Sequence, residues 1–128
     1  MTLRTRYADI PPYVTKDGSV IRELMHPGVH GNTNQSLAEA TVAVGAATIA
    51  HRHHVTAELY LITAGEGRMT LGERMIDVRV GDTIAIPPQT IHSIANTGST
   101  PLTILCACAP AYSHDDTELV DAAPGATR

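Results

Sequence analysis

Short apolar runs separated by turn-forming residues are the feature that most constrains the fold of this chain. Eight such runs follow one another at intervals of about ten residues, with glycine, asparagine or proline between them, a spacing typical of an antiparallel barrel or sandwich. No segment keeps a helical period for long enough to compete with this interpretation. The expected strands cover residues 37–44, 47–53, 58–63, 67–71, 74–80, 83–86, 91–96 and 102–108. The sequence therefore predicts an all-β fold.

Length and composition predict one domain with an aliphatic core. The 128 residues are close to the commonest domain size, and the chain is 43% hydrophobic without a single Phe or Trp. We expect residues 36–110 to form a barrel and residues 1–35, which are rich in turn formers, to be an arm of the same domain. In the C-terminal segment, residues 111–128, we expect a helical turn over 116–122 and a frayed end over 123–128.

Four side chains with metal-binding groups stand in two short frames. His51 and His53 lie two apart on an expected strand, so they project from one face, about 6.6 Å apart along the chain. Glu58 begins the next run, and His92 opens another run after a proline turn. Three imidazole nitrogens and one carboxylate suit a borderline divalent metal such as Fe, Mn, Ni, Cu, Co or Zn better than Ca or Mg. The pattern predicts one divalent transition metal per chain.

The same residues, with the glycines and prolines around them, resemble the two motifs of the cupin superfamily. The agreeing positions are Gly45, His51, His53, Glu58 and Gly65 in the first motif and Gly81, Pro87, His92 and Asn96 in the second. This resemblance implies a single-domain jelly-roll β-barrel in which His51, His53, Glu58 and His92 are the metal ligands. It also implies a homodimer in which the N-terminal arm exchanges a strand with its partner.

One position departs from the family pattern. Gln89 stands where the family usually has glycine, so either the turn tolerates the substitution or the Gln89 amide contacts the bound molecule. Only residues 66–80 separate the two motifs, which is room for a hairpin and not for a lid. A cover over the metal must therefore come from residues 1–35, from the segment after Cys108, or from a second subunit.

Further candidate site residues lie outside the two histidine frames. Arg22 can bind an anionic substrate through its guanidinium group, or it can lie on a solvated edge. Tyr60 shares a face with Glu58, where its hydroxyl can orient the substrate or supply a proton, although a core tyrosine is an equal alternative. Cys106 and Cys108 are expected to be two thiols, either small core residues or, for one of them, part of the pocket.

The segment after the last expected strand carries several hydrogen-bonding side chains. In one interpretation Tyr112 and His114 cap the mouth of the barrel, Tyr112 contacting the substrate and His114 acting as a proton carrier. In the other, Asp115 or Asp116 is the N-cap of a terminal helix. His54 is out of phase with the two histidines before it, so we expect it to face away from the metal.

Charge and hydropathy favour a small molecule as the substrate. A net charge of −4 without a basic run argues against nucleic acid. No apolar stretch approaches the roughly 18 residues of a membrane span, and no apolar signal region follows the start, so we expect a cytoplasmic protein that does not bind membranes. A six-coordinate metal with four protein ligands leaves two adjacent positions. We rank a dioxygenase-type reaction first, a redox-neutral decarboxylase or sugar or oxo-acid isomerase second, and a non-catalytic small-molecule-binding cupin third.

Overall fold

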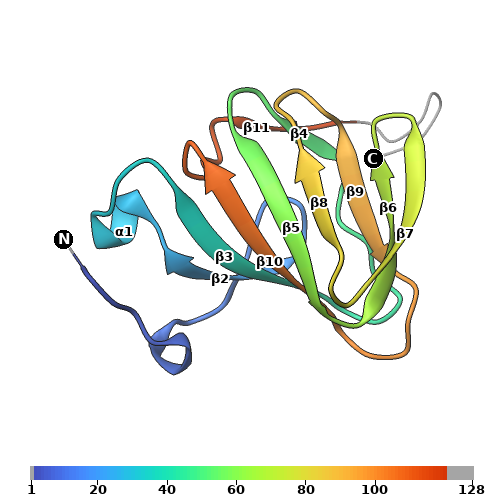
Figure 1. The fold of residues 1–128 in the computed structure, drawn as a ribbon, viewed down its shortest axis with the longest axis horizontal. Coiled ribbons are helices and arrows are strands. Elements are labelled where there is room, and N and C mark those ends of the chain that lie inside the picture. The colour runs from blue at the N-terminus through green and yellow to red at the C-terminus, as the bar shows by residue number, and fades with distance from the viewer. Residues whose placement is uncertain (1, 121–128) are drawn as a thin grey trace.

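The structure, a computed structural model, describes residues 2–120, and its regular secondary structure is almost wholly β-strand (Figure 1). The two short helices are η1 (Tyr7–Asp9) and α1 (Pro27–His30). The strands are β1 (Tyr13–Val14), β2 (Val20–Met25), β3 (Ser36–Val42), β4 (His51–His53), β5 (Ala57–Ala64), β6 (Glu66–Leu71), β7 (Arg74–Arg79), β8 (Thr83–Ile86), β9 (His92–Asn96), β10 (Leu102–Ala109) and β11 (Thr117–Leu119). Within residues 2–120 there is no helix with the length and apolar character needed to cross a membrane.

Two antiparallel sheets make up the barrel. One has six strands in the order β1-β2-β3-β10-β5-β8, and the other has five in the order β11-β4-β9-β6-β7. The chain passes between the sheets after β3, β4, β5, β7, β8, β9 and β10, so strands close in sequence often face each other rather than pair. This arrangement confirms the predicted all-β jelly-roll fold.

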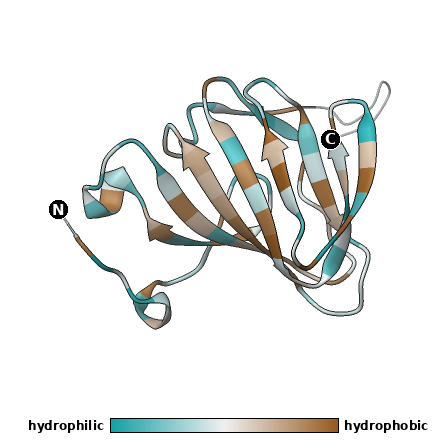
Figure 2. Cartoon of the chain, viewed as in Figure 1, coloured by the Kyte–Doolittle hydropathy of each residue, from teal (hydrophilic) through white to brown (hydrophobic). Residues whose placement is uncertain are grey.

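The alternation of side chains along each strand places an aliphatic core between the sheets. On β5, Glu58, Tyr60 and Ile62 are buried whereas Leu59 and Leu61 are exposed, and Figure 2 shows bands of changing hydropathy along this strand. The largest fully buried apolar side chains are Ile62, Met69, Ile86, Ile94, Leu102 and Ile104. Each contributes about 1.5–3 kcal/mol by leaving water. The core therefore holds the strands in place around the polar residues that point inward among them.

The link between the two sequence frames forms the β6–β7 hairpin, as expected. Its first strand, β6, passes very close to β9. A Cβ added at Gly67 would lie only 2.5 Å from the main-chain oxygen of Ala95. Only glycine permits this approach, which lets β6 and β9 pair along their length. The hairpin thus fixes β9, and β9 carries His92.

The helical turn expected over 116–122 is wrong in its described part. Residues Thr117–Leu119 form strand β11, which pairs antiparallel with β4, and residues 121–128 lie outside the described residues. An acidic, alanine-rich composition favours a helix locally, but pairing with the free edge of β4 satisfies backbone groups of both segments. The alternative of a helix N-cap at Asp115 or Asp116 is wrong for the same reason. Instead, the Asp116 carboxylate accepts hydrogen bonds from the main-chain N–H groups of Val55 and Thr56.

Candidate metal centre

Strands β4, β5 and β9 bring the four expected ligands together between the two sheets. His51 and His53 point inward from β4, and His51 pairs in register with His92 on β9. All three histidines are buried, and one ring nitrogen of each lies within 4.8 Å of the others. The Oε1 atom of Glu58 lies 3.1 Å from Nε2 of His53 and 3.5 Å from Nε2 of His92. Pairing between distant strands therefore assembles what the sequence holds in two separate frames.

Main-chain carbonyls orient two of the imidazole rings. Nδ1 of His51 lies 2.7 Å from the carbonyl oxygen of Ile49, and Nδ1 of His92 lies 2.9 Å from that of Thr90. Because a carbonyl oxygen only accepts, each Nδ1 must carry the proton and donate it. The Nε2 atom of each neutral ring then carries a lone pair and faces the cluster. This is the tautomer that a metal needs.

The third ring, that of His53, has the same tautomer, but its Nδ1 donates to a side-chain hydroxyl instead of a main-chain carbonyl. Its Nδ1 lies 2.9 Å from Oγ1 of Thr117, and the Thr117 hydroxyl donates its own proton to the carbonyl oxygen of Ser113 at 2.8 Å. The hydroxyl oxygen is therefore an acceptor towards His53. Strand β11, which no sequence pattern indicated, thus fixes the tautomer of a central ligand.

Electrostatics hold the carboxylate of the cluster in its charged form. Burial alone would raise the pKa of Glu58, but its interactions with His53 and His92 outweigh burial and lower the pKa to about 2. Burial, and then the charge of a protonated His92, lower the pKa of His51. At neutral pH the site therefore presents an anionic oxygen beside a neutral His51.

The donor set fits a divalent transition metal. Nε2 of His92 is buried and has no hydrogen-bond partner among the described residues, and such an unpaired group costs about 1–3 kcal/mol. A bound ion would satisfy it. Because bonds from such an ion to nitrogen or oxygen are about 2.0–2.2 Å long, two donors on one ion lie at most about 4.4 Å apart. The separations of Glu58 from His53 and His92, 3.1 and 3.5 Å, meet this limit.

A small cavity of about 40 Å³ adjoins the ligands. Three carboxylates line it, those of Asp17, Glu23 and Glu58, and no Lys or Arg does so in the part of the chain that the structure describes. Its cover comes from both ends of the chain, since Tyr13 and Tyr112 also line it. These belong to the N-terminal segment and to the segment after Cys108, two of the three sources that the short β6–β7 link allows.

Among the expected catalytic and substrate-binding residues, Tyr60 and Tyr112 line this cavity and His114 lies one hydrogen bond further out. The ring of Tyr112 packs edge-on against His53, with centroids 5.8 Å apart. Its hydroxyl lies 3.3 Å from Oγ1 of Thr15 and 3.0 Å from Nδ1 of His114. A chain of hydrogen bonds therefore runs from the exposed His114 to the cavity wall.

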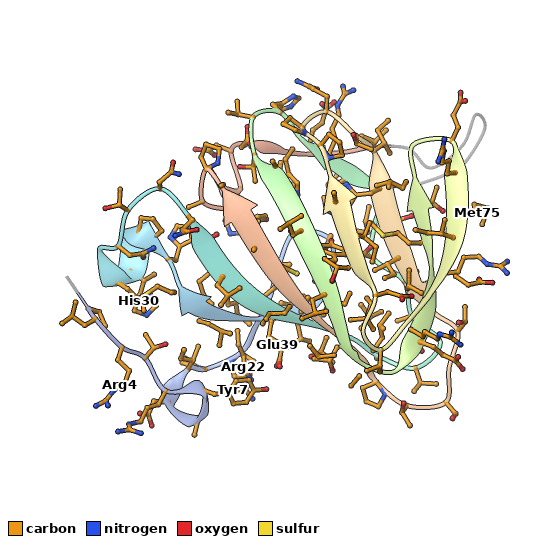
Figure 3. The ribbon with its side chains drawn as sticks, viewed as in Figure 1. Arg4, Tyr7, Arg22, His30, Glu39 and Met75 are labelled. Atoms are coloured by element: carbon orange, nitrogen blue, oxygen red, sulfur yellow. The ribbon has the colours of Figure 1, made fainter. Side chains whose placement is uncertain are left out.

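Gln89 and Arg22 lie away from the cavity. Gln89 has a φ of 70°, so it keeps the left-handed backbone expected of glycine, and its side-chain amide donates to the carbonyl oxygen of His54 at 3.2 Å. The guanidinium of Arg22 stacks on the ring of Tyr7 at 4.6 Å and donates to the carbonyl oxygen of Ile10 at 2.7 Å (Figure 3). Both side chains thus have structural partners.

The structure also shows the surroundings of His54, Cys106 and Cys108, the other side chains that the sequence analysis discussed. His54 is exposed, and its Nε2 lies 3.3 Å from a carboxylate oxygen of Glu118, in agreement with the phase argument. Cys106 and Cys108 are free thiols, and Cys106 lines the cavity. Sγ of Cys108 lies 3.4 Å from Oε2 of Glu58 and donates to it. Burial raises the pKa of both cysteines, so they stay protonated at neutral pH.

Asp17, like Thr117, is a residue of the site that the sequence did not indicate as a candidate. Its Oδ2 lies 3.8 Å from Nε2 of His51, and its side chain is 13% exposed. The Asp17-Gly18 pair predicts a tight turn, but it does not predict which other part of the chain the turn contacts. Its nearness to His51 depends on how β1 and β2 pair beyond β3.

Comparisons with known proteins agree with the fold. Residues 38–108 match the family model described as the cupin domain. An uncharacterized protein of Methanocaldococcus jannaschii is 51% identical over 119 residues, which cover 93% of this chain and 95% of that protein. A predicted oxalate decarboxylase from Thermotoga maritima shares the fold with a TM-score of 0.74 and 24% identity, over 84% of this chain and 99% of the other. The Streptomyces nucleoside dehydratase Pac13 gives a TM-score of 0.70 and 17% identity, over 94% and 92%. This chain belongs to the cupin family.

Proposed function

We propose that this chain is a metal-dependent enzyme that moves a proton on a small, uncharged molecule bearing hydroxyl or carbonyl groups. The observation that carries the proposal is the chain of hydrogen bonds from His114 through the Tyr112 hydroxyl to Thr15 at the cavity wall. Isomerases and lyases need such a route, because in their reactions a proton leaves one atom and arrives at another without net oxidation.

The ligand cluster supports a Lewis-acid role. A divalent ion held by His51, His53, His92 and Glu58 would polarise a carbonyl or hydroxyl oxygen of the substrate. Tyr60 stands beside this position, with its ring edge-on to His92. Burial raises the pKa of Tyr60 well above its usual value, so its hydroxyl stays protonated and serves to orient an oxygen by donating to it.

Tyr112 is the residue we assign to proton transfer. Its hydroxyl sits between two groups that can each accept or donate, Thr15 on the cavity side and His114 on the solvent side. A proton taken from the substrate side can therefore pass outward as the three groups exchange their hydrogen bonds. Because His114 lies at the surface, it can return the proton to water.

The charge of the cavity supports an uncharged substrate over an anionic one. Asp17, Glu23 and Glu58 line the wall, and a carboxylate or phosphate placed among them would meet like charge. Arg22, which the sequence offered for an anionic substrate, is engaged by Tyr7. Pac13, which shares the fold, was solved with uridine, an uncharged nucleoside.

A dioxygenase is the second candidate, and the ligand set favours it. A redox-active ion held by three imidazoles and one carboxylate would have room for both a substrate oxygen and O₂. The sequence ranked this reaction first. We place proton transfer ahead of the dioxygenase, because oxygen insertion has no need of a hydrogen-bonded route from the surface to the cavity.

The two candidates differ in what a redox-inert metal can do. We would load the protein with Zn²⁺ or with Fe²⁺ and incubate each form in D₂O with uncharged keto and hydroxy sugars. If the enzyme transfers protons, the Zn²⁺ form alone should incorporate deuterium from the solvent at a carbon next to the carbonyl of the sugar. NMR monitors this incorporation. Tyr112→Phe should lower that rate by about 10²-fold or more at unchanged metal content, and the exposed His54→Ala variant is the matched control.

Other results would point elsewhere. Oxygen consumption that requires Fe²⁺, with no exchange under Zn²⁺, would support the dioxygenase. Saturable binding of a sugar to the metal-loaded protein without either reaction would mean that the chain is a binding protein. Failure to bind Zn²⁺ and Fe²⁺ would overturn the metal-dependent function itself.

A further inference from the structure

A tight turn in the N-terminal segment carries the carboxylate of Asp17 to the histidine cluster. The turn closes through the N–H of Gly18 donating to the carbonyl oxygen of Thr15 at 3.0 Å. The main-chain oxygen of Asp17 accepts from the N–H of Ile49 at 2.8 Å, two residues before His51. The turn is therefore fastened to the chain segment that leads into β4.

The two carboxylate oxygens of Asp17 have different surroundings. Oδ1 accepts from the main-chain N–H of Ser19 at 2.9 Å and from the Ser19 hydroxyl at 2.6 Å. Ser19 is itself buried, so this oxygen is held in place. Oδ2 is left to face Nε2 of His51 at 3.8 Å. Ser19 thus aims one oxygen of the carboxylate at the cluster.

This contact brings two acceptors face to face. Nδ1 of His51 donates to the carbonyl oxygen of Ile49, so Nε2 of the neutral ring offers a lone pair to Oδ2 of Asp17, which offers another. Two lone pairs at 3.8 Å repel each other unless a positive centre lies between them. Two donors on one ion can be up to about 4.4 Å apart, so the separation suits a shared metal.

Charge balance agrees with the same arrangement. Asp17, Glu23 and Glu58 line a cavity that has no Lys or Arg on its wall within the described residues. Of the three, Asp17 and Glu58 lie against the histidine cluster. Buried charges need partners, and neutral imidazoles supply none. One divalent ion would offset the charges of Asp17 and Glu58, the two carboxylates that lie against the histidines.

We propose that Oδ2 of Asp17 is a fifth protein ligand of the metal, beyond the three histidines and Glu58. This inference rests on the proposed metal centre and deepens it. A six-coordinate ion would then keep one open position, which suits a substrate bound through a single oxygen. Metal binding would also fasten the N-terminal turn to the barrel, because Asp17 belongs to both.

Cobalt binding to the isolated protein tests the proposal without any substrate. Co²⁺ affinity is measured by competition with a chromophoric chelator, and its visible spectrum reports the number and type of ligands. Asp17→Asn keeps an oxygen for the Ser19 hydrogen bonds but removes the anionic donor. We expect it to weaken Co²⁺ binding by at least about tenfold and to change the spectrum. Asp9→Asn, which makes the same charge change at an exposed residue of η1, should match the wild type in both.

Hydrogen exchange supplies a readout that follows the turn itself. In the wild type, Co²⁺ should slow exchange of the Gly18 and Ile49 amides, and in Asp17→Asn it should not. If Asp17→Asn does not fold, Ser19→Ala replaces it, since this variant keeps the carboxylate and removes a hydrogen bond that aims it. Ser19→Ala should weaken Co²⁺ binding, and unchanged binding would overturn the role of Asp17.

The outcomes separate this inference from the proposed function. A wild type that binds no Co²⁺ removes the metal centre and the fifth ligand together. A wild type that binds Co²⁺, with an Asp17→Asn variant of equal affinity and spectrum, overturns only the fifth ligand. Weaker binding with an unchanged spectrum also overturns it, because Asp17 would then act through charge alone and not as a ligand.

Discussion

Replacing Thr117 with valine tests whether the hydrogen bond to His53 prepares that ring for metal binding. Among the three histidines of the cluster, His53 alone has a side-chain acceptor at Nδ1, whereas the other two donate to main-chain carbonyls that no substitution removes. Valine has nearly the shape of threonine but lacks the hydroxyl. The change therefore removes the acceptor while β11 can still pair with β4.

The structure gives the size of the expected effect. Thr117→Val leaves one buried group unpaired, the Nδ1–H of His53, at about 1–3 kcal/mol. The carbonyl oxygen of Ser113 keeps a partner, because it also accepts from the main-chain N–H of Asp116 at 3.2 Å. His53 can recover one bond by moving its proton to Nε2, where Oε1 of Glu58 accepts at 3.1 Å. That tautomer has no lone pair for the metal. We expect metal affinity to fall by about tenfold to a hundredfold.

Two measurements check this expectation. Competition with a chromophoric chelator gives the Zn²⁺ affinity, and nitrogen NMR of the metal-free protein shows which ring nitrogen of His53 carries the proton. Thr117→Ser keeps the hydroxyl and should restore both to wild-type values. A valine variant that binds Zn²⁺ as tightly as the wild type, with His53 protonated at Nδ1, would refute the reasoning about the tautomer.

Three further predictions follow from the same contacts. His54→Ala should leave metal content unchanged in elemental analysis, because His54 faces Glu118; a large loss would mean that the β4 register is wrong. Gly67→Ala should lower the free energy of unfolding by about 1–3 kcal/mol or more, measured with urea, because its Cβ would meet the main chain of Ala95; an unchanged value would contradict that contact. Burial, and then the charge of a protonated His92, lower the pKa of His51 below the usual 6.5 of a histidine. As pH falls, the unfolded chain therefore takes up this proton before the folded chain does. Metal-free protein should therefore lose stability below about pH 6.5, and His51→Gln should lessen that loss in urea titrations; equal pH dependence in both would count against it.

Local periodicity carried most of what the sequence predicted about the site. The two-residue repeat of a strand places His51 with His53, and Glu58 with Tyr60, on inward faces, and the structure has them there. It also turns His54 outward. These predictions succeed because the side-chain direction on a strand depends only on neighbours in the chain.

Contacts set by strand order were beyond the same reasoning. Asp17 reaches His51 only because β1 and β2 extend the sheet beyond β3, and Thr117 reaches His53 only because β11 pairs with the edge of β4. Neither pairing has a period or a motif in the sequence. The helical turn expected over 116–122 is wrong over its described residues, 116–120, for this reason, since pairing with a distant strand outweighed local composition.

The wall of the cavity bears on the kind of substrate that can reach the ligands. The inner cavity of about 40 Å³ has room for only a few water molecules, since each needs about 10–15 Å³. Tyr13, Glu23 and Tyr112 line both this cavity and a surface hollow of about 560 Å³, so a larger molecule must displace them. The wall is held by hydroxyl contacts, Tyr13 with Glu23 at 3.2 Å and Tyr112 with Thr15 at 3.3 Å, each worth about 1 kcal/mol. A substrate whose own hydroxyls replace these bonds opens the wall at little cost, whereas an apolar molecule of the same size leaves them unpaired. The cover therefore favours polyhydroxy compounds even before they reach the metal.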